Sequence, residues 1–426
     1  MNRKNQPGRR RRAGHRERGV VSIVVALSLA VLIGFVGLAL DLGKLYVTKS
    51  ELQNSADACA LAAARDLTGA IDLKISEADG ITAGHLNYAL FQGSAVQMLT
   101  DSNVTYSTSL SSSFQPRSSI NAATAATIKY VQCTAGMAGI ANWFIQVLNV
   151  LPGMNVAQTS AVSARAVATV GAAQTTCAIP VFMCKPGTEV SPPNPTETYT
   201  LGQWISSKQG SPPKYGPGSF GWASLTGDKS AKSIRDQLTG NQCTLPVAGT
   251  LLGSPGNKFT DSGAWNTRFG LYGGAYKAPA AGTTDGTPDF TGFAYTPTSF
   301  PSQQNAYSDF VAKRAIFKPY QGDGPLPGSG LNTGGSAQQS NYYNGADRRL
   351  ALAPEVDCTQ YLTNKQANVL DWVCVLMLDP MESGGGAGPV HLEFRGRSTD
   401  PGSPCATQGV PGDVNAVGPQ VPVLVQ

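Results

Sequence analysis

The sequence is poor in charged residues and in histidine, and it lacks the common catalytic motifs. Asp, Glu, Lys and Arg make up 14% of its 426 residues, whereas about 25% is typical of soluble globular domains. Of its three histidines, His85 and His391 lie beyond the first 40 residues, and neither accompanies an activated serine or cysteine motif. GxSxG, Walker and HExxH motifs do not occur. These absences argue against a hydrolase, an NTPase or a zinc protease, and we expect no enzyme activity, no cofactor and no metal site.

Two short motifs resemble functional sites but lack the context that the chemistry needs. Residues 216–221 spell GxGxxG, yet they lie among prolines, without the preceding strand and following helix of a dinucleotide site. Residues 228–232 nearly spell the DxSxS metal site of von Willebrand A domains, but Lys232 occupies the last position. We interpret the first motif as a turn and infer that the second binds no metal.

The net charge of +5 is confined to the N-terminus. Residues 1–40 hold eight basic residues and one acidic residue, which leaves 24 basic and 26 acidic residues, a net charge of −2, for residues 41–426. A nearly neutral body offers no basic surface for DNA or RNA. We therefore expect no nucleic-acid partner.

An uncharged apolar run covers residues 20–40. A helix of that length rises about 30 Å, enough to cross the hydrocarbon core of a bilayer. Because the basic residues precede the run, the positive-inside rule assigns residues 1–19 to a cytoplasmic tail and the chain from Asp41 onward to the periplasm. The pattern predicts a single-pass protein of the bacterial inner membrane. A cleaved signal peptide is the alternative, although the run is long for one and no A-x-A cleavage pattern follows it.

Small residues recur at every fourth position of this run, namely at Ser22, Ala26, Ala30 and Gly34. At that spacing they share one face of a helix, where the backbone of another helix can approach closely. Small residues are also common in membrane helices, so the pattern fits ordinary composition equally well. The first interpretation predicts contact with partner helices or a homo-oligomer.

The chain after the run is predicted to be α+β, disulfide-stapled and rich in loops. Residues 41–67 follow an approximate heptad pattern and should continue the membrane helix as a stalk. Residues 68–170 should form a small α+β block, with strands at 103–107, 128–133 and 161–168 and a short buried helix at 139–148. Residues 171–426 should form a loop-rich periplasmic domain, with a helix at 228–238, strands at 350–352, 369–378 and 390–394, and long loops at 191–218 and 320–340.

All eight cysteines lie beyond the apolar run, at positions 59, 133, 177, 184, 243, 358, 374 and 405. In an oxidising periplasm they would form disulfides, and their spacings match neither a CxxC redox pair nor a zinc site. Cys177 and Cys184 flank a six-residue segment and are the preferred local pair. Cys59, on the predicted stalk, would be either buried and free or a cross-link between two copies.

A set of motif residues follows one another along the predicted membrane and stalk helix. Arg18 and Gly19 precede the apolar run, and the matching positions after it are Asp41, Gly43, Tyr46, Leu52, Gln53, Asn54, Ala56 and Asp57. Their order corresponds to A-x-D-x-G-x-x-Y followed by L-Q-N-A-A-D-A-A-A-L-A. In this pattern residues 18–67 resemble the N-terminal domain of the TadG-like proteins of tight-adherence (Flp) pilus systems. Cys59 departs from the pattern, because the family has alanine there.

The resemblance implies a membrane-anchored structural or accessory component of Flp pilus assembly, which contacts other pilus-assembly or secretion components and has no catalytic residues. Many relatives carry a von Willebrand A domain, whose metal motif is missing here. Processing like that of a pilin is not expected, because Val24 stands where pilins carry glutamate. Two alternatives stay open: an anchored or secreted binding protein or adhesin unrelated to pili, and an extracytoplasmic hydrolase.

Overall fold

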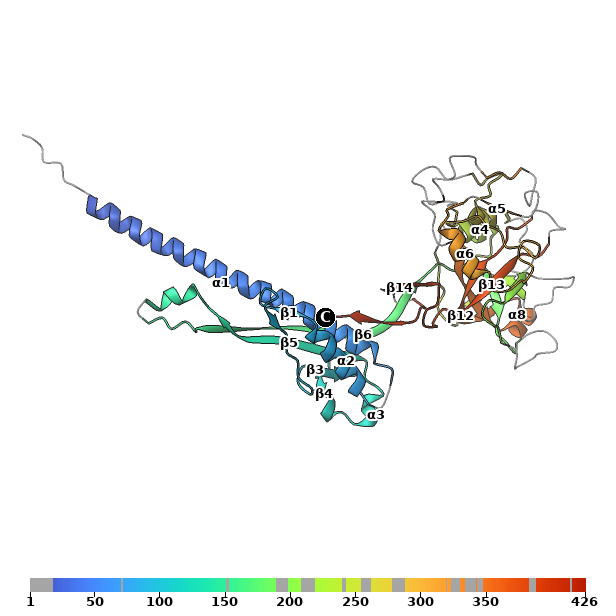
Figure 1. Cartoon of the computed structure of the whole chain (residues 1–426). Helices are drawn as coiled ribbons and strands as arrows, with labels where there is room; N and C mark the ends of the chain where they lie inside the picture. Colours follow the sequence, from blue (N-terminus) through green and yellow to red (C-terminus); the bar gives the residue numbers. More distant parts are fainter. Residues whose placement is uncertain are drawn as a thin grey trace, which may run out of the picture. The chain divides into compact units, whose positions relative to one another are not determined.

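The apolar run and the predicted stalk form one continuous helix, α1 (Arg18–Arg65), of 48 residues (Figure 1). Large apolar side chains of its first part are exposed; Val21, Leu29 and Phe35, for example, are 63%, 56% and 66% exposed. Within the described residues, α1 is the one helix long and apolar enough to cross a membrane. Since 48 residues rise about 72 Å, a helix that crosses a bilayer with residues 20–40 continues far beyond it.

The computed structural model describes residues 18–69, 72–150, 153–188, 198–207, 219–239, 243–253, 262–277, 288–318, 320–322, 330–333, 342, 348–382, 388–413 and 416–426. The chain divides into a first unit, Met1–Val170 with Pro422–Gln426, and a second unit, Gly171–Val421. The predicted basic tail therefore lies mostly outside the described residues, as do Gly216, Gly218 and most of the predicted loops at 191–218 and 320–340.

The first unit packs the second half of α1 against α2 (Lys74–His85) and an antiparallel sheet. The sheet consists of β3 (Val104–Ser107), β4 (Gln115–Pro116), β5 (Tyr130–Ala141) and β6 (Thr159–Thr175). Strand β15 (Gln420–Leu424) also pairs with β6, and the last residues of β6, Ala173 and Thr175, pair with β14 (Ala406–Pro411) within the second unit. Smaller elements of this unit are β1 (Tyr88–Ala89), β2 (Ser94–Ala95), η1 (Arg117–Ser119) and α3 (Ala122–Ala125).

The residues predicted to form a stalk are instead part of this core. Leu52, Ala56, Ala60 and Ala63 of α1 are fully buried, together with Val131 and other residues of the sheet. Alanine side chains are short enough for a helix to lie close to a sheet, and burying this face removes apolar area from water. The division between a stalk at 41–67 and a separate block at 68–170 is therefore wrong.

The predicted helix at 139–148 is also wrong. Strand β5 continues to Ala141, paired with Thr159 of β6, and only the 3₁₀ helix η2 (Ile145–Val150) follows it. The register shifts between Met137 and Ile140, where Gly139 has a φ of +74°. Pairing with β6 therefore prevails over local helix propensity. The strands predicted around residues 103–107, 128–133 and 161–168 are confirmed as β3, part of β5 and part of β6.

The second unit is built on a seven-stranded sheet in the order β10-β12-β11-β7-β9-β8-β13. Because β12 also pairs with β13, six of these strands close into a ring. Their bounds are β7 (Val181–Cys184), β8 (Trp204–Ser207), β9 (Ser219–Trp222), β10 (Leu251–Leu252), β11 (Leu350–Val356), β12 (Ala367–Met377) and β13 (His391–Arg397). The predicted strands at 350–352, 369–378 and 390–394 are confirmed, and β12 has the predicted central position, between β10, β11 and β13.

Short helices accompany this sheet, namely α4 (Ala231–Thr239), α5 (Ser262–Asn266), η4 (Thr267–Phe269), α6 (Tyr307–Arg314) and α8 (Cys358–Asn364). Helix α4 confirms most of the helix predicted at 228–238. Alternate residues of β12 belong to two different buried clusters: Cys374 and Leu376 to one, Val373 and Val375 to the other. Burial on both faces explains why this strand is a nearly continuous apolar run.

Four disulfides join the eight cysteines: Cys59–Cys133, Cys177–Cys243, Cys184–Cys358 and Cys374–Cys405. The predicted Cys177–Cys184 pair is wrong, because the segment between them contains strand β7 and separates its ends. Disulfide partners have Cα atoms about 4.4–6.8 Å apart, whereas the extended residues Val181–Cys184 of β7 alone span about 10 Å. Both alternatives for Cys59 are wrong as well, since it is bonded to Cys133 of β5 in the same chain.

Candidate functional site

The motif residues of α1 divide between two faces of the helix. Asp41, Leu52 and Ala56 are buried against the first unit, whereas Gly43 and Asn54 are exposed and Tyr46 is 76% exposed. An α-helix turns through about 100° per residue, which places these two sets on opposite sides. One half of the motif therefore attaches α1 to its own domain, and the other half does not.

The carboxylate of Asp41 holds the start of the short helix η2. It accepts hydrogen bonds from the backbone N–H groups of Trp143, Phe144 and Ile145, at 3.2, 2.8 and 2.7 Å. Burial raises the pKa of Asp41, but these three donors and the nearby Lys44 lower it more, and the pKa lies below its usual value. The group is therefore a carboxylate at neutral pH and satisfies three N–H groups that no helical turn precedes.

Two neighbours of Asp41 complete this contact. The ammonium of Lys44 donates to the carbonyl of Ala141 at 3.1 Å and lies 4.0 Å from the centroid of the Trp143 ring. On the other side, a Cβ added at Gly37 would lie 2.5 Å from the Cβ of Phe144, so only glycine permits this approach. We call the described residues between β5 and β6, 142–150 and 153–158, the hairpin tip; they lie beside α1 in Figure 1.

Further motif residues attach α1 to the sheet and to α2. The Gln53 amide donates to Asp57 at 2.7 Å and to the backbone carbonyl of Arg165 in β6 at 3.1 Å. The Ser55 hydroxyl donates to the carbonyl of Gly84 in α2 at 2.9 Å. The Cys59–Cys133 disulfide adds a covalent link to β5. The second part of the motif, from Leu52 onward, thus serves largely to pack α1 against its own domain.

A strained loop is held by α1 as well. Leu90, Phe91 and Gln92 have φ values of 60°, 57° and 61°, a left-handed conformation that costs energy for residues other than glycine. The Glu51 carboxylate accepts from the backbone N–H groups of Phe91 and Gln92 at 3.0 and 3.2 Å and from the Gln92 amide. The loop leaves the Phe91 side chain 62% exposed.

The opposite side of α1 is open except at Gln53, which bonds to β6, and at the half-buried Asp57. We define the open face as Leu42, Gly43, Tyr46, Ser50 and Asn54, which lie within about 120° of one another around the helix and are all exposed. A Cβ added at Gly43 would meet nothing within 4 Å, and the Tyr46 hydroxyl makes no hydrogen bond to any described residue. Among the described residues, nothing therefore requires the glycine or the tyrosine for the fold.

The small residues predicted to form a helix-packing face are placed as follows. Ser22 and Ala26 are exposed and Gly34 is half-exposed, with open space around an added Cβ; the Ala30 side chain lies outside the described residues. Gly37 follows Gly34 by three residues, and Asp41 follows Gly37 by four. Residues at these intervals share one side of a helix, so the small residues lie on the side of α1 that contacts the hairpin tip further along. Within the described residues, the structure leaves this face available to another helix.

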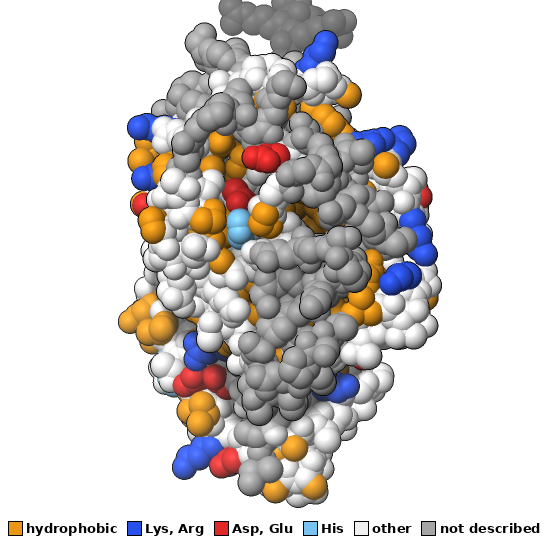
Figure 2. All heavy atoms as spheres, turned by 90° about the vertical axis from the view of Figure 1, so that its right-hand side faces the viewer, with side chains coloured by type: hydrophobic (Ala, Val, Ile, Leu, Met, Phe, Trp, Pro, Cys, Tyr) orange, Lys and Arg blue, Asp and Glu red, His pale blue; other side chains and the backbone are white. Residues whose placement is uncertain are grey.

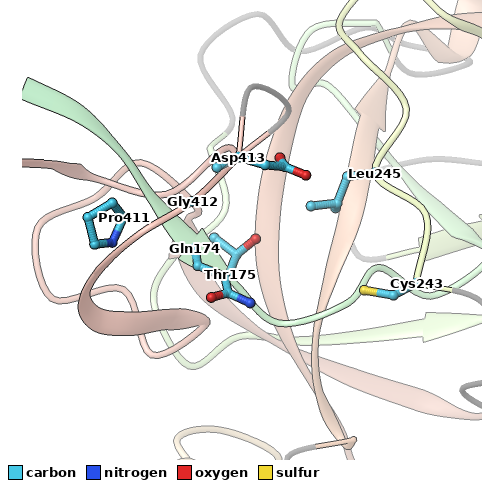
Figure 3. Close-up of a pocket in the computed structure, with 8 residues that line it drawn as sticks. Gln174, Thr175, Cys243, Leu245, Pro411, Gly412 and Asp413 are labelled. Carbon is cyan, nitrogen blue, oxygen red and sulfur yellow. The ribbon is translucent and has the colours of Figure 1, made fainter. Parts of the chain in front are cut away.

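The second unit contains a cavity of about 360 Å³ (Figure 3). It is lined by Gln174, Thr175, Cys243, Leu245, Pro411, Gly412, Asp413 and Ala416. Cys243 forms a disulfide with Cys177 and is therefore not a free thiol. The buried Thr175 hydroxyl has no hydrogen-bond partner among the described residues. The lining combines one carboxylate with no histidine, so it offers no pair of groups for acid–base catalysis.

His391 and Asp379 form a buried pair in the same unit. The His391 ring Nδ1 lies 2.6 Å from the Asp379 carboxylate, and the backbone N–H of His391 donates to the same carboxylate at 2.6 Å. Among the described residues, no serine or cysteine side chain hydrogen-bonds to the His391 ring. His85 lies between the N–H and the carbonyl of Met98, at 2.7 and 3.0 Å. Both histidines therefore make contacts that support the fold.

On the face of the second unit in Figure 2, we consider the residues that are drawn in colour. Basic and acidic side chains are scattered there among uncharged and apolar ones and form no large patch of one sign. No group of three or more metal-ligating side chains occurs in the described part of the chain. The candidate functional site is therefore the segment of α1 around Asp41, with its hairpin contact and its open face.

Sequence reasoning identified Asp41, Gly43 and Tyr46 through the family motif. It assigned no role to Gly37 at the end of the apolar run, and it missed Trp143 and Phe144, which were assigned to a buried helix. The adjacent aromatic residues between two uncharged segments were the available signal.

Residues 19–66 match the family model described as "Putative Flp pilus-assembly TadE/G-like". The match falls on α1 and covers 48 of the 426 residues, which confirms the resemblance recognised in the motif residues. No curated protein and no solved structure matches the chain.

Proposed function

We propose that this protein is a non-enzymatic, membrane-anchored component of Flp pilus assembly in the bacterial inner membrane. In this proposal α1 crosses the membrane once with residues 20–40. The basic residues before the run keep the N-terminus in the cytoplasm, and both units lie in the periplasm. The TadE/G-like match on α1 supports the association with pilus assembly. The four disulfides support an oxidising compartment.

The open face of α1 carries this proposal, because its motif residues Gly43 and Tyr46 have no packing role among the described residues of their own chain. Gly43 and Tyr46 lie one turn apart, directly after the apolar run, where helices of other membrane components would be adjacent. A glycine without a steric need of its own lets a second backbone approach, and a neighbouring tyrosine supplies a large contact area with a polar end. We propose that this face binds a helix of another pilus-assembly component.

Replacement of Tyr46 by alanine tests the open face. The Tyr46→Ala protein should reach the normal cellular amount, because its fold does not use this side chain, while adherent pili are lost. Lys49→Ala, on the same exposed side but outside the motif, is the matched control and should leave piliation intact. Normal piliation of the Tyr46→Ala strain would exclude the open face as the binding surface for a pilus-assembly component. Normal piliation after deletion of the gene would exclude a role in pilus assembly altogether.

The membrane anchor is tested separately. Membranes containing a C-terminally tagged copy are washed with alkaline carbonate, and the intact mass of the retained protein is measured. Retention at full length supports the anchor. Release of a shorter protein that lacks residues 1–40 would contradict it and would favour a secreted protein.

A second candidate, an anchored or secreted binding protein, is favoured by the cavity of the disulfide-linked second unit. It predicts binding of the full-length protein, in detergent or nanodiscs, to a cell surface or glycan array. Piliation would be unaffected by changes in the second unit. The two candidates thus differ in the part of the chain on which the phenotype depends.

A further inference from the structure

The hairpin tip exposes apolar side chains that its own domain does not cover. Trp143 is 66% exposed, Phe144 is 43% exposed and Met154 is 47% exposed. Exposed single apolar residues are common on proteins, but adjacent aromatic residues in one short loop mark a contact surface. What this surface contacts follows from its position and from its charge.

Its position is fixed against the apolar run of α1. Phe144 packs on Gly37, and the carboxylate of Asp41 holds the backbone of Trp143, Phe144 and Ile145. Gly37 lies four residues before Asp41, which is about 6 Å of helix rise. Phe144 therefore lies beside the apolar run itself, about one turn inside its end.

The hairpin is also free of charge over an unusual length. Residues 130–164 contain no Asp, Glu, Lys, Arg or His, a stretch of 35 residues bounded by Lys129 and Arg165. The cation beside the tip is Lys44 of α1, whose ammonium lies over the Trp143 ring and bonds the Ala141 carbonyl. Tryptophan with a nearby lysine that reaches toward water is the combination found at membrane–water interfaces.

The backbone N–H groups at the start of the hairpin tip are hydrogen-bonded, as the membrane–water interface requires. Where water is scarce, an unpaired N–H group is costly, and irregular backbone is tolerated only when its polar groups are satisfied. The N–H groups of Trp143 and Phe144, just before η2, and of Ile145, its first residue, are satisfied by Asp41, which follows the apolar run directly. These hydrogen bonds keep the three N–H groups satisfied when the tip leaves bulk water.

We infer that the hairpin tip is a second membrane contact of this chain. It inserts Trp143 and Phe144 into the interfacial layer of the bilayer that α1 crosses, on the side of the two units. The inference rests on the proposed membrane anchor. Two points of contact fix the rotation and tilt of α1 and hold the first unit against the lipid surface, whereas a helix alone would let it swing.

The test uses the full-length protein in lipid nanodiscs and the fluorescence of Trp143. Lipids brominated near the headgroup, lipids brominated near the chain end, and aqueous iodide serve as quenchers. Of the other four tryptophans, Trp222, Trp265 and Trp372 are at most 3% exposed. We expect headgroup-region bromine to quench the most, and Trp143→Phe to abolish this quenching. Trp204→Phe, a substitution in the second unit, is the matched control and should preserve it.

Three results would overturn the inference. If Trp143 is quenched by iodide and not by brominated lipid while α1 stays in the bilayer, the tip faces water and the anchor stands. If Trp143 is protected from both quenchers at high protein density and exposed to iodide on dilution, a second copy covers the tip. If carbonate releases the protein from membranes, the anchor and the inference fall together.

Discussion

The carboxylate of Asp41 accepts a hydrogen bond from the backbone N–H of Ile145 at 2.7 Å, 104 residues further along the chain. This contact joins the end of an apolar helical run to the tip of a β-hairpin. It gives a structural reason for the aspartate of the family motif, since the side chain satisfies backbone groups that the hairpin cannot satisfy itself. A change of this one residue should therefore act far away in the sequence.

Asp41→Asn should loosen the hairpin tip without unfolding the first unit. Asparagine keeps the size of the side chain but removes the charge and one acceptor oxygen, so charge-assisted hydrogen bonds become weaker. We expect amide exchange at Trp143, Phe144 and Ile145 to speed up by about tenfold. Exchange in β3 and the central part of β5 should stay unchanged, and uniform acceleration throughout the unit would contradict this local role.

The same contact should depend on pH. The pKa of Asp41 is lowered from 3.8 in the folded chain, so the folded state binds fewer protons than the unfolded state. The stabilisation by Asp41 is then fully present at a pH above the pKa of Asp41 in the unfolded chain. It is lost as the pH falls through the lower pKa of the folded chain. Amide exchange at residues 143–145, measured downward from pH 6, should accelerate relative to the intrinsic rate only below about pH 4. Asp41→Asn should abolish this dependence; a transition near neutral pH would point to another group.

Gly37 and Gly34 form a matched pair for testing the fit between α1 and the tip. A Cβ at Gly37 would lie 2.5 Å from Phe144 Cβ, whereas a Cβ at Gly34 would meet nothing within 4 Å. Gly37→Ala should displace the tip, at a cost of about 1–3 kcal/mol for an overpacked contact. The changed emission of Trp143 reports the displacement, and Gly34→Ala should leave it unaltered. Equal spectra for both variants would mean that Phe144 does not pack on Gly37.

The disulfides can be mapped directly. Peptide mass spectrometry under non-reducing conditions should find Cys59 linked to Cys133 and Cys184 linked to Cys358, and a Cys177–Cys184 peptide would contradict the fold of the second unit. Replacement of both Cys59 and Cys133 by alanine should lower the stability of the first unit by about 4 kcal/mol. The two residues are 74 positions apart, and a long loop restricts the unfolded chain strongly.

Arg349 should be essential for the second unit. Its side chain is fully buried; it donates to the carbonyls of Met377 and Phe293 and lies 4.3 Å from the ring centroid of Phe269. Burial lowers the pKa of Arg349 to about 10, so the group stays charged at neutral pH. Arg349→Met would leave several buried carbonyls unpaired, at about 1–3 kcal/mol each.

We therefore expect the Arg349→Met unit to unfold in thermal denaturation while the first unit keeps its own transition. Lys232→Ala is the control, because the Lys232 side chain is 79% exposed. A thermal transition of the second unit that is unaltered in Arg349→Met would show that the buried guanidinium is dispensable.

The sequence by itself determined the features that depend on neighbouring residues. The uncharged run at 20–40 and the heptad pattern after it predict one long helix, because helix formation and hydropathy are local properties. The apolar residues of β12 predict a buried strand for the same reason. The TadE/G-like motif is also local, since all its positions lie within α1, and so it could be recognised without a fold.

The tertiary structure alone decided which of these local pieces meet. The partner of Cys59 lies 74 positions away and that of Cys184 lies 174 positions away, and no spacing within the sequence encodes such pairs. The predicted stalk proved to be a core helix because a sheet from residues 104–175 covers its alanine face. Residues 139–141 became strand because β6 offered them a pairing edge. Each outcome is a non-local contact whose energy exceeds the local preference of the chain.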